Sequence, residues 1–169
     1  MKALKGFPVL ALAAMLGSAC TGPVEEAPTR SIDQRSFRLG SIAAFAEMVD
    51  AGVKTLALSA AVDPSEMDEM VEEATRLAAE HDVEVFRETD FLETDLFSTE
   101  LTEGKHVLLI YRGDTRQRYM DLKEEKLRLQ ELGQYQGEAR KEIARRFGEL
   151  LSYSGEKIEA LLQARQSGL

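Results

Sequence analysis

The chain has 169 residues, a length that suits one domain with some residues left for tails. Hydrophobic residues make up 44% of it and charged residues 30%, which is typical of a soluble globular protein and argues against global disorder. Acidic residues outnumber basic ones by 30 to 21, so nucleic acid is a poor partner.

The first residues of the chain have the three parts of a secretion signal. Lys2 and Lys5 form a positive region, residues 7–16 form an apolar region, and small residues then lead to Cys20, the only cysteine of the chain. The apolar region is too short to span a membrane, which takes about 20 residues.

This stretch resembles a bacterial lipoprotein signal, whose lipobox ends in an acylated cysteine. The resemblance covers residues 1–20 and implies that residues 1–19 are a signal peptide and that Cys20 becomes the first mature residue, carrying a diacylglyceryl thioether and usually an amide-linked acyl chain too. The pattern departs from the usual one at Gly17, where a leucine is the rule. Cleavage by an ordinary signal peptidase, giving a free secreted protein, is the alternative.

The resemblance also implies a location. Thr21 stands where an aspartate would retain the protein in the inner membrane, so the protein is expected in the outer membrane, facing the periplasm. Residues 20–35 are polar and hold two prolines, which is typical of a flexible tether, here lipidated and spanning on the order of 20 Å. One α/β domain is expected over residues 36–169, and it folds without disulfides because the lipid consumes the only thiol.

The first predicted elements of this domain are a helix and a strand. One helix face is apolar from Ile42 to Val49, with Phe45 and Ala46 between them, and Gly52 is well placed to end that helix. Residues 54–59 predict a short buried strand.

The next helix has the clearest amphipathic pattern of the chain. Asp63 offers an N-cap, and Pro64 stands at the first helical position. The apolar face comprises Met67, Met70, Val71, Ala74, Leu77 and Ala78, and Val71 and Leu77 in particular are expected to be buried. A strand at residues 83–87 would complete a βαβ unit, so we expect the first two strands to be parallel.

Residues 106–111 predict a central strand, because the run HVLLIY is apolar almost throughout. The preceding segment is long for a loop, and an edge strand is expected near residues 91–97. Three helices then run toward the end of the chain, the first capped by Asp114 and ending at Gly133, the last capped by Ser154. The sequence therefore predicts an α/β fold: a small sheet of three to four strands with a βαβ unit, followed by three C-terminal helices.

Charge is unevenly spread along the domain. Residues 36–104 carry 4 basic and 17 acidic side chains, whereas residues 105–169 carry 13 basic and 10 acidic ones. We expect the basic helices to fold back on the acidic half and form weak surface ion pairs. The alternative is a basic face that meets a partner protein or an anionic component of the envelope.

Most catalytic and cofactor motifs are missing from the sequence. It has no G-x-S-x-G or H-E-x-x-H motif, no clustered histidines and no glycine-rich phosphate loop, so no cofactor or metal is expected. The repeated Glu-Thr-Asp at residues 88–90 and 93–95 could bind a divalent cation or a basic partner. A simpler explanation is that these acids keep an edge segment from pairing with other chains.

One group of residues suggests an anion site, at the carboxyl end of the strand over residues 106–111. Ligands of open α/β sheets bind at such ends, helix starts favour anions, and arginine binds carboxylate or phosphate through two bonds. If the strand at residues 83–87 is parallel to this one, its end stands on the same rim. The expected site then comprises Arg87, Asp90, Arg112, Arg116 and Arg118. The alternative is a plain turn in which Asp114 caps the helix and the arginines are solvated.

Two functions follow from these patterns. The first is a lipid-anchored, periplasm-facing envelope protein that acts as a non-enzymatic binding module for a protein or envelope polymer. The second is an envelope hydrolase or transferase acting on an anionic small molecule at the strand rim. The sequence shows no nucleophilic side chain paired with a general base, and this favours the first function.

Overall fold

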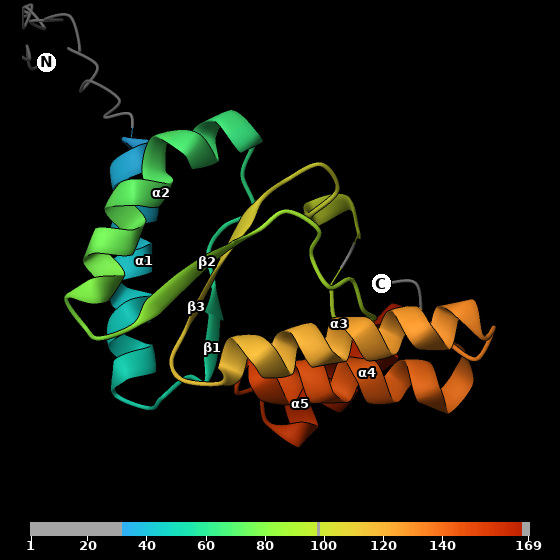
Figure 1. The fold of residues 1–169 in the computed structure, drawn as a ribbon. Coiled ribbons are helices and arrows are strands. Elements are labelled where there is room, and N and C mark those ends of the chain that lie inside the picture. The colour runs from blue at the N-terminus through green and yellow to red at the C-terminus, as the bar shows by residue number, and fades with distance from the viewer. Residues whose placement is uncertain (1–31, 98, 167–169) are drawn as a thin grey trace, which may run out of the picture. The chain divides into compact units, whose positions relative to one another are not determined.

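The computed structural model describes residues 32–97 and 99–166, so Cys20 and most of the expected tether lie outside the described residues. Over the described part, the chain forms five α-helices, three strands and one short 3-10 helix (Figure 1). In chain order these are α1 (Gln34–Asp50), β1 (Leu56–Leu58), α2 (Pro64–Ala79), β2 (Glu84–Glu88), η1 (Thr99–Leu101), β3 (Val107–Tyr111), α3 (Thr115–Glu131), α4 (Gly137–Leu150) and α5 (Gly155–Gln166).

The three strands form one antiparallel sheet with the order β1-β3-β2. Tyr111 of β3 lies opposite Leu56 on one side and opposite Glu84 on the other. β1 and β2 run in the same direction, because each is antiparallel to β3, but they do not pair with each other. The predicted parallel direction of β1 and β2 is therefore observed, but β3 lies between them, so the predicted βαβ unit is not confirmed and both strand pairings are antiparallel.

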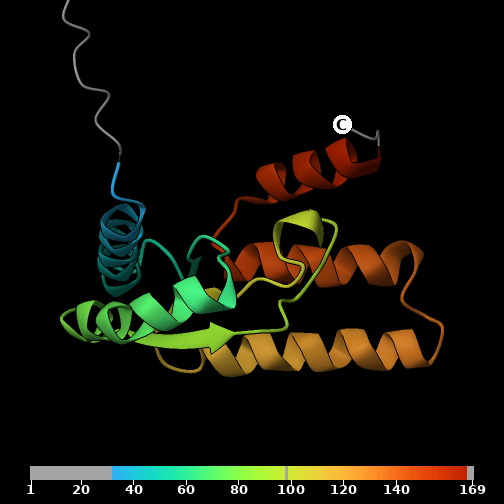
Figure 2. The same ribbon diagram turned by 90° about the horizontal axis from the view of Figure 1, so that it is seen from above.

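β3 occupies the centre because both of its faces are apolar. Leu108 and Ile110 belong to the core under α1 and α2, whereas Leu109 and Tyr111 belong to the core shared with α3, α4 and α5. All five residues of β3 are buried, as the apolar run predicts. The sheet thus has α1 and α2 on one face and the three C-terminal helices on the other (Figures 1 and 2).

Capping residues set the starts of the first two helices. The Asp33 carboxylate accepts two N–H groups of the first turn of α1, at 3.1 and 3.4 Å, so this helix begins two residues before the expected start of the domain at Ser36. α2 begins at Pro64 as predicted, and Glu66 Oε2 accepts the N–H of Asp63 at 3.3 Å.

The buried face of α2 lies within the predicted apolar stripe. Met67 and Met70 are fully buried, together with Ala74 and Ala78 further along the helix. Val71 and Leu77, which were expected to be buried, are only half-buried and pack at the margin of the core. The prediction is thus confirmed for four of the six residues of the stripe and wrong for Val71 and Leu77, because the part of an apolar stripe that becomes fully buried depends on where α1 and the sheet lie.

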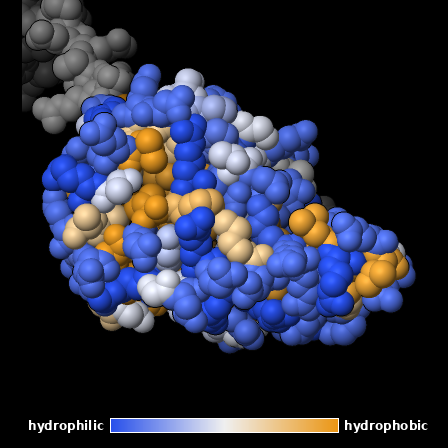
Figure 3. Space-filling view, viewed as in Figure 1, coloured by the Kyte–Doolittle hydropathy of each residue, from blue (hydrophilic) through white to orange (hydrophobic). Residues whose placement is uncertain are grey.

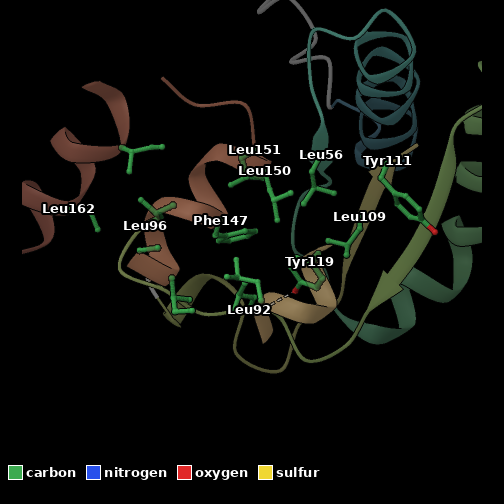
Figure 4. Close-up of a cluster of buried hydrophobic side chains, with 14 residues drawn as sticks. Leu56, Leu92, Leu96, Leu109, Tyr111, Tyr119, Phe147, Leu150, Leu151 and Leu162 are labelled. Carbon is green, nitrogen blue, oxygen red and sulfur yellow. Dashed lines mark hydrogen bonds between the residues drawn. The ribbon is translucent and has the colours of Figure 1, made fainter. Parts of the chain in front are cut away.

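The three C-terminal helices end and begin close to the predicted positions. α3 is followed by Gly133, whose φ of +65° is the left-handed conformation that ends a helix. Ser154 caps α5, since its Oγ accepts the N–H of Lys157 at 3.2 Å. Phe147 of α4 lies at the centre of the core that these helices share with the sheet (Figure 4).

The connection between β2 and β3 crosses this core, and its residues 91–97, all of which the structure describes, form no edge strand. Its side chains Leu92 and Leu96 are buried against the helices. The hydroxyl of Tyr119 accepts the N–H of Leu92 at 2.9 Å, as the dashed line in Figure 4 shows. The expected edge strand is therefore wrong, because the apolar residues of this segment anchor it to α3 and α4 instead.

Basic side chains from the second half of the domain pair with acidic ones from the first, as the simpler interpretation of the charge pattern predicts. Lys105 Nζ lies 2.6 Å from Asp63 Oδ1, and Arg140 Nε lies 2.8 Å from Asp95 Oδ2. Such exposed pairs contribute about 0–1 kcal/mol each. The face seen in Figure 3 is mostly hydrophilic, with apolar groups gathered where α2 and β2 lie.

Candidate functional site

The structure separates the residues of the expected anion site. β2 is antiparallel to β3, and Arg87 pairs with Leu108 near the start of β3. Arg87 and the following Asp90 therefore lie at one end of the sheet, while Arg112, directly after β3, lies at the other. The shared rim required parallel strands, so these residues do not form one site.

Arg112 is held by two carboxylates of the fold. Its Nη1 donates to Asp50 Oδ1 at 2.7 Å, at the end of α1, and its Nη2 donates to Asp82 Oδ2 at 2.9 Å, beyond the end of α2. These pairs already use the guanidinium N–H donors of Arg112 that would bind an anion. Arg112 thus fastens the ends of two helices to the end of β3.

The other residues at this junction face different surroundings. The guanidinium of Arg116 lies over the ring of Phe86, 3.9 Å from its centroid. Arg118 lines a separate hollow between α3 and α4, together with Arg146. Asp114 stands at the N-cap position of α3, but its side chain makes no capping hydrogen bond with the described residues, so the expected capping role is not observed.

At the opposite end of the sheet, Arg87 and Asp90 are also engaged. Arg87 Nη1 donates to Asp68 Oδ1 at 2.5 Å, and its Nε donates to His106 Nδ1 at 3.0 Å. Asp90 Oδ2 lies 3.2 Å from Lys123 Nζ. Each of the five expected residues therefore has surroundings of its own, and the geometry does not bring them together.

Lys123 is also part of a buried polar cluster. Its Nζ lies 3.3 Å from both carboxylate oxygens of Glu88, a residue that is only 4% exposed. Glu88 Oε1 also accepts the N–H of Asp90 at 2.8 Å. Burial, and then the nearby Glu88 charge, raise the pKa of the Tyr119 hydroxyl, which therefore stays protonated. The cluster fastens the β2–β3 connection to α3 and offers no activated nucleophile.

A pocket of about 280 Å³ opens beside the end of β1, where the sequence indicated no site. Segments far apart in the chain line it, and most of their side chains are aromatic or aliphatic. We call it the aromatic pocket. Its lining residues are Phe45, Lys54, Leu58, Ser59, Ala61, Phe91, Phe97, Leu101, Thr102, Val107, Leu151 and Tyr153.

The wall of the aromatic pocket is continuous with the core. The rings of Phe91 and Phe97 meet edge to face with 6.1 Å between their centroids, and both also contact the buried ring of Phe147, at 5.7 and 5.8 Å. Such ring pairs stabilise by about 0.5–1.5 kcal/mol beyond the burial of their area. The wall is therefore held in place before any ligand arrives.

Among the described residues that line the aromatic pocket, Lys54 is the only charged one. Its Nζ donates to the carbonyl of Leu151 at 2.9 Å and lies 5.6 Å from the centroid of the Tyr153 ring. Burial lowers the pKa of Lys54 from its ordinary value. The next residue, Thr55, donates its N–H to Ser152 Oγ at 2.8 Å, so this segment is fastened to the turn between α4 and α5.

The sequence contained only a weak signal for this pocket. Phe91 and Phe97 stand in a connection that is long for a plain loop, and long loops are often functional. The sequence pattern predicts an edge strand in that segment and a buried strand that starts at Lys54. The residues that line the pocket are too far apart in the chain for any periodic pattern to join them.

Within the described residues, no group of His, Cys, Asp or Glu side chains is arranged to hold a metal ion. None of the helices described there is both long enough and apolar enough to cross a membrane. No family model matches the chain, and neither a curated protein nor a solved structure matches it. The function must therefore be inferred from the chemistry of the pocket itself.

Proposed function

We propose that this protein is a lipid-anchored, periplasm-facing module of the bacterial cell envelope that binds a ligand noncovalently in the aromatic pocket. The observation that supports binding rather than catalysis is the chemistry of the lining. No histidine, cysteine or carboxylate is among the described residues that line the pocket. The Ser59 hydroxyl is engaged by the fold, since it donates to the carbonyl of Ala60 at 2.8 Å and accepts the N–H of Leu108 at 2.9 Å.

The size of the pocket supports a small ligand. Its volume of about 280 Å³ is just below the range of roughly 300–1,000 Å³ that is usual for small-molecule pockets. An apolar group that leaves water for this pocket gains about 25 cal/mol for each Å² of apolar surface that it buries. A short chain or a single ring therefore suits the site better than a folded partner does.

The proposed anchor and location rest on the sequence of residues 1–20. The positive region, the apolar region and Cys20 resemble a lipoprotein signal, and Thr21 favours the outer membrane over the inner one. Two or three acyl chains would hold the protein stably, whereas one chain binds a membrane only marginally.

The alternative function, a hydrolase or transferase acting on an anionic small molecule, has less support. It required Arg87 and Arg112 to meet at one rim, and they lie at opposite ends of the sheet. Both guanidinium groups are also paired with carboxylates of the fold.

Binding in the pocket is tested with 1-aminoanthracene, a small neutral dye that fluoresces in apolar surroundings. We expect saturable fluorescence with the wild type and a large loss of it with Ala61→Phe, which places a ring inside the pocket. Ala160→Phe adds the same ring to an exposed position of α5 and should leave the dye signal unchanged. Equal dye binding by wild type and Ala61→Phe would show that this pocket is not the binding site.

The anchor is tested by fractionation of cells that express the wild type or Cys20→Ala. The wild type should be in the detergent-soluble membrane fraction, and the variant should move to the soluble periplasm or accumulate as an uncleaved precursor. A soluble wild type whose N-terminal mass shows no acyl chains would refute the anchor but not the binding function.

A further inference from the structure

Lys54 gives an otherwise apolar pocket one positive group. The aromatic rings and aliphatic side chains of the lining can bury a hydrocarbon tail, and the ammonium group stands at the wall beside them. We propose that the ligand of the aromatic pocket is an amphiphilic monocarboxylate, whose short acyl or aromatic tail lies among the phenylalanine rings and whose carboxylate binds Lys54 Nζ. This inference rests on the binding function proposed above and names its ligand class.

The Lys54 ammonium has donors to spare. An ammonium group has three N–H donors, and one of them is used by the carbonyl of Leu151. Lys105 and Lys123 pair with carboxylates of the fold, whereas no ion pair between described residues includes Lys54. A ligand carboxylate would supply the missing counter-charge.

The partly buried position of Lys54 strengthens its interaction with a ligand of opposite charge. Burial already lowers its pKa, which indicates that its charged form has lost part of its hydration. A hydrogen bond between two charged groups is stronger where water is partly excluded. The hydrogen bond to Leu151 holds the ammonium in place, so little side-chain freedom is lost on binding.

The surrounding charge favours a ligand with a single negative charge. Residues 36–104, which supply most of the lining, carry 17 acidic and 4 basic side chains. Such a surface repels nucleotides and other polyanions at long range. One carboxylate at the one cation of the pocket avoids most of this repulsion.

The test compares three ligands of equal chain length by isothermal titration calorimetry: decanoate, 1-decanol and decyltrimethylammonium. The protein is the full chain with Cys20→Ser, which removes the acylation site so that neither lipid nor detergent competes for the pocket. Decanoate should bind about tenfold or more tightly than decanol, because a hydrogen bond to a charged group contributes that much, and the cation should bind most weakly. Equal affinities for decanoate and decanol, or tighter binding of the cation, would overturn the proposal.

Two variants connect the preference to Lys54. Lys54→Met, which keeps the length of the side chain but not its charge, should reduce the affinity for decanoate to that for decanol and leave decanol binding unchanged. Lys54→Arg keeps the charge and should keep the preference for decanoate over decanol. A decanoate preference that survives Lys54→Met would overturn the role of Lys54. If none of the three ligands binds or displaces 1-aminoanthracene, the pocket function itself fails. If decanol binds as tightly as decanoate, only the carboxylate inference fails.

Discussion

Replacing Gly148 by alanine tests how closely α5 packs on α4. A Cβ at this position would lie 2.7 Å from Ile158 Cγ1, 2.8 Å from Ile158 Cδ1 and 3.2 Å from Leu96 Cδ1. Gly148 has ordinary helical backbone angles, so alanine causes no backbone strain there. The only obstacle to alanine is therefore the lack of space for its Cβ.

Two opposite effects set the size of the change. Alanine is more favourable than glycine in a helix interior by about 1 kcal/mol. Against this, an extra carbon in a packed core costs about 1–3 kcal/mol. Two atoms of Ile158 are too close, and this buried, β-branched side chain has few other rotamers, so we take the upper half of that range. Gly148→Ala should therefore lower the free energy of unfolding by about 1–2 kcal/mol.

Urea denaturation followed by circular dichroism measures this change, and two comparisons identify its cause. Gly40→Ala, in the interior of α1, meets no atom within 4 Å and should stabilise the protein by about 1 kcal/mol. In the background of Ile158→Ala, where the clashing atoms are gone, Gly148→Ala should change sign and stabilise by about 0.5–1 kcal/mol. If Gly148→Ala stabilises the otherwise unchanged protein as much as Gly40→Ala does, the described packing of α5 on α4 is wrong.

Three further predictions concern the core of α2, its first turn and the end of β3. Met70→Ala should lower the free energy of unfolding by about 2–5 kcal/mol and Leu77→Ala by less, because Met70 is buried and Leu77 only half-buried; equal losses in urea denaturation would contradict this difference in burial. The hydrogen bond from Arg38 holds the pKa of Glu66 below its ordinary value of 4.5, so its stabilising effect is complete above that pH and is lost as the pH falls through the lowered pKa. Glu66→Gln should thus be less stable than the wild type at neutral pH and equally stable in strong acid, and a difference that persists in acid would refute this linkage. Arg112→Lys should lower stability by no more than about 1 kcal/mol. Because the carboxylates of the fold already engage Arg112, this variant should respond to phosphate in a thermal-shift assay as the wild type does, and a phosphate response that the variant loses would restore the anion site at this junction.

The sequence by itself determined the helices and strands along the chain, because their signals are local. Pro64 begins α2, Gly133 follows the end of α3 and Ser154 caps α5, each through contacts within a few residues of itself. The apolar run of β3 likewise predicted that this strand is central, since only a central strand is covered on both faces.

Tertiary structure alone decided how the strands pair. A run of apolar residues predicts a strand but does not show which neighbour it pairs with or in which direction. Inserting β3 between β1 and β2 made the sheet antiparallel and placed Arg87 far from Arg112. The side chains of the expected anion site could be picked out in the sequence, but only the antiparallel pairing of β2 with β3 shows that Arg87 and Arg112 are apart.

The candidate site also depends on tertiary structure. Lys54 is an ordinary residue of its local sequence, and its importance comes from the Leu151 carbonyl and the Tyr153 ring, which are about a hundred residues away in the chain. Phe91 and Phe97 become a pocket wall only where they pack on Phe147 of α4. Local propensity determines which elements form, whereas a pocket built from distant segments exists only after the cores on both faces of the sheet have formed.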